Sequence, residues 1–251
     1  MRFGRGEYAS ARAMAERMQG IGGRHRDPVL EVAAHNLAGL VLASQGELEA
    51  AREALQRGIA LAESIEGGLP PARFLVDAIV AMRSNLSRYL QQLGLPDEAR
   101  EQVEAALKRA RELGQPLALS HALRCAGMLE ARQGHPQRVA EIAAELERLV
   151  VNHSLIQAEG ASHCLGGWAQ ARLGEAQAGY SRILSAYEML KRVGMVAGYT
   201  EVLCYAADAA LQAGLHEAAL AHVDEAQALA ERLGEGINLR ELAALRARIN
   251  S

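Results

Sequence analysis

The sequence predicts an all-α protein, a solenoid built from antiparallel helix pairs. Three observations lead to this prediction. Glycines recur at a step of 40 residues at Gly134, Gly174 and Gly214, and each one ends an apolar-periodic segment and precedes another. A second series, Gly194 and Gly234, has the same step. Strong helix formers dominate the composition, aromatic residues make up only 4%, and no segment shows the alternation typical of strands. Such fixed-period self-similarity is the signature of stacked repeats.

The repeat extends over nearly the whole chain. We call its recurring turn residues the corner glycines, and they are Gly6, Gly46, Gly94, Gly134, Gly174 and Gly214. The step is 40 residues except between Gly46 and Gly94, where it is 48, so about six repeats are expected. Positions seven before and five after a corner are mostly small, as at Gly167 and Gly179. Small residues there predict that two helix backbones approach closely.

These columns resemble the tetratricopeptide repeat (TPR), most clearly in the segments 6–11 and 46–51. The resemblance implies a right-handed α-solenoid whose first helices line a concave groove. Two differences stand out, because the usual repeat has about 34 residues and ends in a proline that is missing here. The longer step resembles the TPR region of bacterial signal-transduction ATPases, maltose-regulator-type transcription activators and multidomain adenylate cyclases.

Proline and glycine set the expected helix boundaries. Prolines are tolerated at the first helical position, and they stand where helices should begin at Pro28, Pro71, Pro96, Pro116 and Pro136. The segment Gly20 to Gly23 is interpreted as a loop, and the eight extra residues near Glu66 as a longer loop or an added helical turn. The expected helices are 7–20, 28–45, 48–64, 71–93, 96–113, 116–133, 136–151, 155–173, 175–193, 196–213, 216–233 and 238–250.

Residues 1–251 are predicted to form a single solenoid domain that is a fragment of a longer protein. Gly6 is a corner with no first helix before it, and 238–250 has the pattern of the first helix of a further repeat. Solenoids normally need polar capping repeats, so either the terminal helices cap the stack by themselves or the chain is a piece of a longer protein, and we expect the piece.

Charge and hydropathy exclude several classes of partner. The net charge is −3 with both signs interspersed, which argues against direct nucleic-acid binding, since that requires a concentrated basic face. No apolar run approaches the ~18 residues of a membrane span, and the first residues lack a signal-peptide hydrophobic segment. We therefore expect a cytoplasmic protein with no membrane partner. The sequence leaves a homodimer open.

The sequence offers no catalytic residue, no metal site and no cofactor-binding motif that we would assign. Cys125, Cys164 and Cys204 come from three successive first helices, and we expect them to pack as small apolar residues. A soft-metal site with the neighbouring histidines is a remote alternative, because no CxxC spacing exists. His216 and His222 are six residues apart, which is out of register for one metal, and they are interpreted as surface residues.

The resemblance places the binding surface on the inner side of the first helices. Arginines beside a tryptophan and a tyrosine suit an extended peptide with a carboxylate, or an anionic small molecule. In the alternative interpretation, Trp168 fills an inner seam, and Arg132 and Arg172 are solvated corner charges. The candidate binding residues are Asn36, Asn85, Arg88, Arg124, Arg132, Trp168, Arg172, Tyr205 and Asp208, and Ser84, Gln92, His121, Met128 and Glu201 share their inward register.

The sequence thus predicts a non-enzymatic protein- or peptide-binding regulatory module, part of a bacterial signalling or transcription regulator. One alternative is a domain that senses a small-molecule inducer. Another is an enzyme, such as a metal hydrolase that uses the histidines and cysteines of the inner helices.

Overall fold

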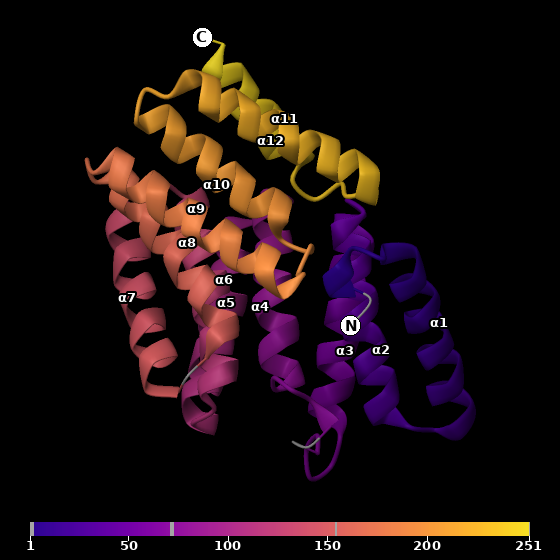
Figure 1. The fold of residues 1–251 in the computed structure, drawn as a ribbon. Coiled ribbons are helices and arrows are strands. Elements are labelled where there is room, and N and C mark those ends of the chain that lie inside the picture. Colours follow the sequence, from indigo (N-terminus) through magenta and orange to yellow (C-terminus); the bar gives the residue numbers. More distant parts are fainter. Residues whose placement is uncertain (1–2, 71–72, 154, 251) are drawn as a thin grey trace. The chain divides into compact units, whose positions relative to one another are not determined.

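The computed structural model describes residues 3–70, 73–153 and 155–250, and every regular element in these ranges is helical (Figure 1). This confirms the predicted all-α class. The elements are η1 (Phe3–Arg5), α1 (Tyr8–His25), α2 (Pro28–Ser44), α3 (Leu48–Ser64), α4 (Ala78–Gln92), α5 (Pro96–Leu113), α6 (Pro116–Arg132), α7 (Pro136–His153), α8 (Ile156–Arg172), α9 (Ala176–Val193), α10 (Tyr199–Gln212), α11 (His216–Leu233) and α12 (Leu239–Ile249).

Contacts between residues divide the chain into two compact units. The N-terminal unit is Glu7–Leu129, and the C-terminal unit is Glu130–Ser251 together with Phe3–Gly6. The short N-terminal segment joins the latter because the Gly4 carbonyl accepts hydrogen bonds from the backbone nitrogens of Val196 (2.8 Å) and Ala197 (3.1 Å).

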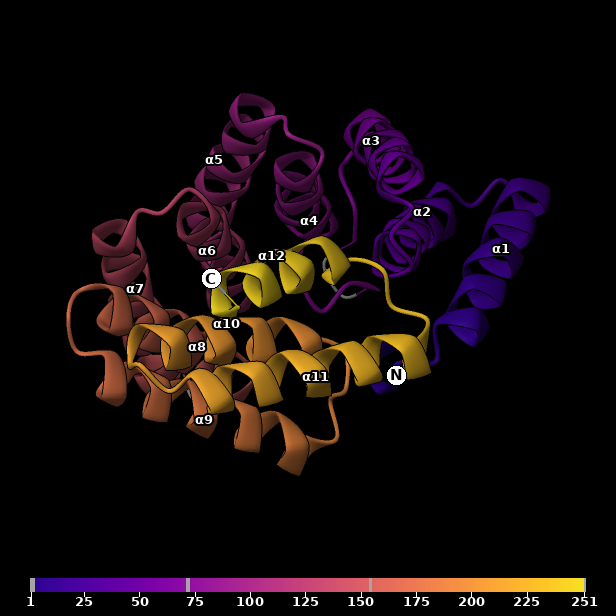
Figure 2. The ribbon, with the colours of Figure 1, turned by 90° about the horizontal axis from the view of Figure 1, so that it is seen from above.

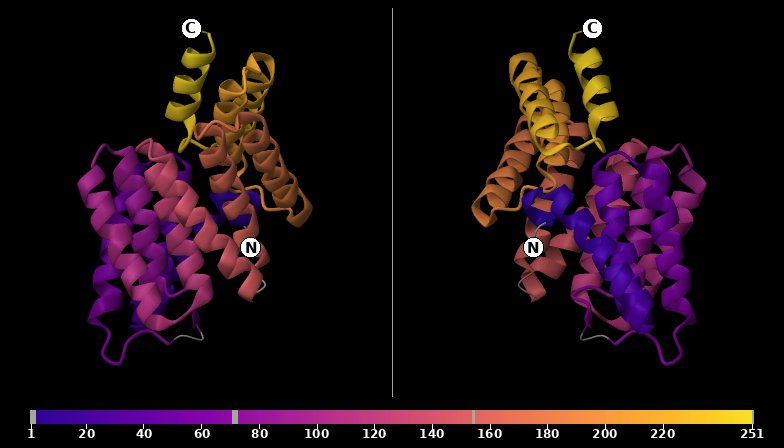
Figure 3. Two further views of the ribbon diagram at one scale, coloured as in Figure 1. Left: turned by 90° about the vertical axis from the view of Figure 1, so that its left-hand side faces the viewer. Right: turned by 90° about the vertical axis from the view of Figure 1, so that its right-hand side faces the viewer.

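Within each unit, the helices stack in chain order. In the N-terminal unit each helix from α1 to α5 packs against the next, and α2 also contacts α4 (Figure 2). In the C-terminal unit the same holds from α7 to α12, and the first helices α8, α10 and α12 contact one another in turn (Figure 3). These contacts between successive helices and successive repeats are what a solenoid produces.

The corner glycines behave as the sequence predicts. Their φ angles range from +74° at Gly214 to +109° at Gly174, which is the left-handed region. A Cβ built on Gly134 would meet nothing within 4 Å, so there the glycine serves the backbone conformation and not the packing.

The small columns are places of close helix approach, as predicted. A Cβ on Gly167 of α8 would lie 2.6 Å from the carbonyl oxygen of Gly179 in α9. In the N-terminal unit, a Cβ on Gly39 would lie 2.6 Å from Cγ of Leu55. Glycine at these positions lets the two helices of a pair touch nearly backbone to backbone.

Two predicted boundaries are wrong. The segment from Gly20 to Gly23 is not a loop, because α1 continues to His25. Gly22 is needed inside this helix for space, since its Cβ would lie 2.6 Å from Cγ of Glu31. The fourth helix begins at Ala78, seven residues after Pro71, which itself lies outside the described residues. The extra residues near Glu66 therefore form a loop, not an added turn.

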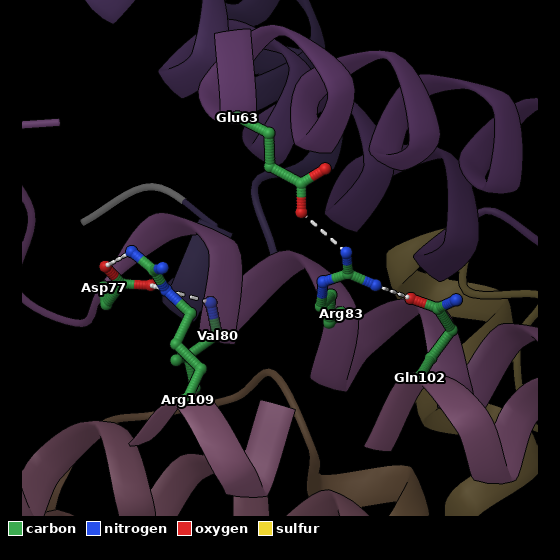
Figure 4. A network of polar contacts seen from close by, with 6 residues as sticks. All are labelled: Glu63, Asp77, Val80, Arg83, Gln102 and Arg109. Atoms are coloured by element: carbon green, nitrogen blue, oxygen red, sulfur yellow. Dashed lines mark hydrogen bonds and ion pairs between the residues drawn. The ribbon is translucent and has the colours of Figure 1, made fainter. Parts of the chain in front are cut away.

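An aspartate determines where α4 begins. Asp77 Oδ1 accepts from the backbone nitrogen of Val80 at 3.0 Å and from Arg109 Nε of α5 at 2.8 Å (Figure 4). Its Oδ2 accepts from Arg109 Nη2 at 2.9 Å. Beside this pair, Arg83 of α4 donates to Glu63 of α3 at 2.6 Å and to Gln102 of α5 at 2.8 Å. Polar contacts thus tie α4 to both neighbouring helices.

Replacing Asp77 with alanine is expected to lower the free energy of unfolding by about 2 kcal/mol at pH 7, because a helix cap and a charge-assisted hydrogen bond are lost. Burial raises the pKa of Asp77, but hydrogen bonds from Arg109 and Val80 outweigh it, so the net pKa lies below 3.8. Because the folded pKa is depressed, this contribution is complete above pH 3.8 and is lost as the pH falls through the folded pKa. Urea unfolding at pH 7 and at lower pH measures both effects.

The matched control is Asp97→Ala, which removes an exposed carboxylate from the first turn of α5. This control should change the unfolding free energy by no more than about 0.5 kcal/mol. If the difference in unfolding free energy between wild type and Asp77→Ala stays constant well below pH 3, the charge of the Asp77 carboxylate is not its cause.

Candidate functional site

The candidate residues predicted from sequence divide between the two units. Asn36 of α2, Asn85 and Arg88 of α4 and Arg124 of α6 lie in the N-terminal unit. The C-terminal unit holds the others, which are Arg132 at the end of α6, Trp168 and Arg172 of α8, and Tyr205 and Asp208 of α10. Each set is therefore described by itself.

In the N-terminal unit, an uncharged histidine lies near two arginines. Burial, together with the charges of Arg124 and Arg88, lowers the pKa of His121 to about 3, although a hydrogen bond to the Ala81 backbone acts in the opposite direction. The imidazole is therefore neutral at pH 7. Its Nε2 atom is buried and has no hydrogen-bond partner among the described residues.

Other buried polar atoms on the first helices of this unit also lack a hydrogen-bond partner among the described residues. Asn36, Ser84 and Arg124 stand at the same register, ten residues before their corner glycines. Within the described ranges, the buried atoms Asn36 Oδ1 and Ser84 Oγ lack a hydrogen-bond partner. Leaving such an atom unpaired costs about 1–3 kcal/mol, so each one calls for a partner, which is either an ordered water or a ligand. We call Asn36, Ser84, Asn85, Arg88, His121 and Arg124 the N-terminal polar face.

In the C-terminal unit, Asp208 is the centre of a network. Its Oδ2 atom accepts from Trp168 Nε1 at 2.9 Å and from Arg172 Nε at 3.0 Å. Its Oδ1 atom accepts from Arg172 Nη2 at 3.1 Å and pairs with Arg248 Nη2 of α12 at 2.8 Å. The residue is only 6% exposed, so its carboxylate is largely shielded from water.

Trp168 is packed inside this network. It is 4% exposed, the Arg172 guanidinium carbon lies 5.5 Å from its ring centroid, and Tyr205 meets it edge-on with ring centroids 6.4 Å apart. This arrangement favours the interpretation in which Trp168 fills an inner seam. Arg172 binds Asp208, while its side chain remains 34% exposed to solvent.

A second ion pair joins Arg132 to α12. Arg132 Nη2 lies 2.6 Å from Glu241 Oε2. Burial raises the pKa of Glu241, Arg132 opposes this, and Glu201 and Asp208 raise it further, so the net pKa lies above the usual value. We call Arg132, Trp168, Arg172, Asp208, Glu241 and Arg248 the C-terminal ion-pair cluster.

Sequence reasoning missed Glu241 and Arg248, although a signal for both exists. They stand 40 residues after Glu201 and Asp208, at the same register of the next first helix. Extending the inward columns by one more step would have found them.

The cysteines lie where the sequence predicts, and one histidine does not. Cys125, Cys164 and Cys204 are free and buried, as predicted, and burial raises the thiol pKa of Cys164 and of Cys204. His222 was predicted to lie on the surface, but it is half-buried and within 2.8 Å of the Tyr180 hydroxyl.

Two further features are absent from the described residues. They contain no group of three or more His, Cys, Asp or Glu side chains that could hold a metal. Within the same ranges, none of the helices combines the length and the apolar character that a bilayer-spanning segment needs.

Comparison with known proteins identifies the fold of the chain. No protein-family model matches the chain, and no curated protein sequence does. Among solved structures, NprR in complex with its cognate peptide NprX matches with a TM-score of 0.64 at 12% identity, over 96% of this chain and 66% of that one. A thermophilic TPR protein of Thermus thermophilus matches with a TM-score of 0.52 at 18% identity, over 87% of this chain and 97% of that one.

The fold is a TPR-like solenoid. BtubC from P. vanneervenii is similar as well, with a TM-score of 0.58 at 17% identity over 90% of both chains. At these identities the likeness establishes the TPR-like architecture of helix pairs and nothing about the ligand.

Proposed function

We propose that this chain is a non-enzymatic peptide-binding regulatory module whose ligand lies along the N-terminal polar face. The observation that carries the proposal is the set of buried acceptor atoms on successive first helices, at Asn36, Ser84 and His121, beside two arginines. NprR, whose TPR-like structure holds its cognate peptide, supports the proposal by analogy.

The chemistry of an extended peptide matches this face. Stacked helices lie ~8–10 Å apart and an extended chain advances ~3.3–3.6 Å per residue, so successive first helices meet about every third residue. The backbone N–H groups of the ligand would satisfy the acceptors of Asn36 and His121, whereas Ser84 is 0% exposed and would stay inside the helix stack. Arg88 and Arg124, whose charges both act on the neutral His121, would bind a carboxylate through charge-assisted hydrogen bonds.

The module would act inside a bacterial signalling or transcription regulator in the cytoplasm, without touching nucleic acid itself. Ligand occupancy would be relayed to a fused or partner output domain. A second function, sensing of a small anionic effector, is favoured by the two arginines, Arg88 and Arg124, whose charges both act on the neutral His121. The same experiment separates the two.

The test is a fluorescence-anisotropy screen with random-sequence peptides of about seven residues, a length that spans three first helices. Affinity for a bound peptide should fall at least about thirtyfold in the double variant Arg88→Ala/Arg124→Ala, because each charged hydrogen bond contributes about 1.5–3 kcal/mol. The matched control, Arg57→Ala/Arg111→Ala, removes two exposed arginines from the second helices α3 and α5 and should bind as wild type does.

Equal peptide affinity in the double variant and the control would show that the wrong face was chosen. Saturable stabilisation by a small carboxylate metabolite, with no peptide bound, would replace the peptide proposal by the effector-sensing one.

A further inference from the structure

The N-terminal polar face has an apolar neighbour at its α2 end. Leu40 of α2 is partly exposed, and it lies six residues before its corner glycine. In the C-terminal unit the same position holds Trp168 and Asp208, which bind one another across successive first helices. By this register Leu40 lies on the inner side of α2, next to Asn36. The first helix of this unit therefore offers a ligand an aliphatic side chain and one polar side chain.

The α4 and α6 end of the face is positively charged. Arg88 has the position of Leu40 in α4, and Met128 has it in α6. Arg124 Nη1 lies 3.2 Å from Met128 Sδ, so the Arg124 side chain reaches this register as well. The charges of Arg88 and Arg124 both act on His121. The sequence of α4 contains no aspartate or glutamate, so α4 itself adds no negative charge to this end.

Two buried acceptor atoms connect the two ends. Asn36 Oδ1 on α2 and His121 Nε2 on α6 have no hydrogen-bond partner among the described residues. The hydrogen bond of His121 to the Ala81 backbone uses the other ring nitrogen, which leaves Nε2 of the neutral imidazole as an acceptor. A backbone that crosses from α2 to α6 can donate N–H groups to both atoms. Its side chains then meet an aliphatic group first and two guanidinium groups afterwards.

We propose that the ligand is a peptide of two parts, an aliphatic side chain that packs on Leu40 and a carboxylate that binds Arg88 and Arg124. This inference rests on the proposed function, because it names the class of peptide that the N-terminal polar face selects. Stacked helices lie ~8–10 Å apart and an extended chain advances ~3.3–3.6 Å per residue, so the two groups are about three to five residues apart. The carboxylate belongs either to an acidic side chain or to the free C-terminus of the peptide.

The test is fluorescence anisotropy of the full chain with four pools of dye-labelled peptides, each of seven residues. The first pool has leucine at its second position, glutamate at its sixth, blocked termini, and only glycine, serine and alanine elsewhere. The second pool replaces the glutamate with glutamine, and the third replaces the leucine with serine. Each replacement should weaken binding to the wild-type protein at least about tenfold, because it removes a charged hydrogen bond or the burial of an aliphatic side chain. The fourth pool keeps the glutamine and frees the C-terminus, so recovery of binding there identifies the terminal carboxylate as the source.

Variants of the protein locate the two contacts by double-mutant cycles. Arg88→Ala/Arg124→Ala should bind the glutamate and glutamine pools within about twofold of each other, and Leu40→Ser should do the same for the leucine and serine pools. The matched control is Leu113→Ser, which removes an exposed leucine from the second helix α5 and should discriminate among the pools as wild type does. Circular dichroism of each variant verifies that its helices are intact.

Equal affinity of the wild-type protein for the first three pools would overturn the inference, and this comparison does not depend on any variant folding. If the pools bind alike and binding is still lost in Arg88→Ala/Arg124→Ala, the proposed function stands and only the two-part ligand is wrong. Binding of random-sequence peptides, but of none of these pools, has the same meaning. If no peptide of any kind binds, the proposed function and this inference are both wrong.

Discussion

Replacing Gly179 with alanine is expected to destabilise the C-terminal unit by about 3 kcal/mol, the upper part of the range for overpacking a rigid contact. The new Cβ would lie 2.6 Å from the backbone nitrogen of Ala171 and would also meet the carbonyl oxygen of Gly167. These are backbone atoms of α8, so no side chain can turn aside to make room. The whole of α8 or α9 would have to shift.

Urea unfolding followed by circular dichroism measures this effect, and Gly160→Ala is its control. Gly160 lies in α8, the helix that Gly179 contacts, and the nearest atom to its Cβ would be the Ala186 carbonyl oxygen at 4.0 Å. Alanine there should be neutral or stabilising by about 0.5–1 kcal/mol, since glycine is unfavourable inside a helix. If Gly179→Ala unfolds at the same urea concentration as wild type, the helices are not in backbone contact.

Replacing Asp208 with alanine is expected to lower the unfolding free energy by about 2–3 kcal/mol, because it leaves the buried Trp168 Nε1 donor unsatisfied and removes a charge-assisted pair with Arg172. The indole Nε1 of Trp168 would lose its acceptor, and Arg172 and Arg248 would lose the carboxylate between them. Tryptophan emission and urea unfolding should report the loss together.

Asp224→Ala is the matched control, because Asp224 also binds an arginine of α12 but its side chain is 58% exposed. Exposed pairs contribute about 0–1 kcal/mol, so this variant should remain close to wild type. Asp208→Asn keeps an acceptor for Trp168 and removes the charge, and it should lie between the two. Equal losses in Asp208→Ala and Asp224→Ala would show that the network does not stabilise the unit.

The sequence predicts this fold well because each repeat carries its own local signals. Pro96, Pro116 and Pro136 begin helices where expected, and glycines such as Gly134 end them in the left-handed conformation. The prediction fails where one residue type has two uses. Gly22 serves packing inside a helix instead of a turn, and the start of α4 is fixed by Asp77 and not by a proline.

The site is predicted less completely, for a different reason. Register places Trp168, Arg172 and Asp208 on the same side of neighbouring helices, and the structure brings these three together. The register does not predict that these side chains bind one another. Their pairing depends on the length of each side chain and on the residues that the next helix places beside them. Arg248 supplied the missing contact, and it lies one full repeat beyond the residues considered.

The step of 40 residues has a consequence for how this chain tolerates rearrangement. Trp168, Asp208 and Arg248 occupy the same position in three successive repeats, as an indole, a carboxylate and a guanidinium. Excising the middle repeat would bring the indole next to the guanidinium with no acceptor between them, and duplicating it would set two carboxylates side by side. Although the backbone is modular, these side chains give the repeats a fixed order. Exchanging the repeats would therefore disrupt the network of Trp168, Asp208 and Arg248.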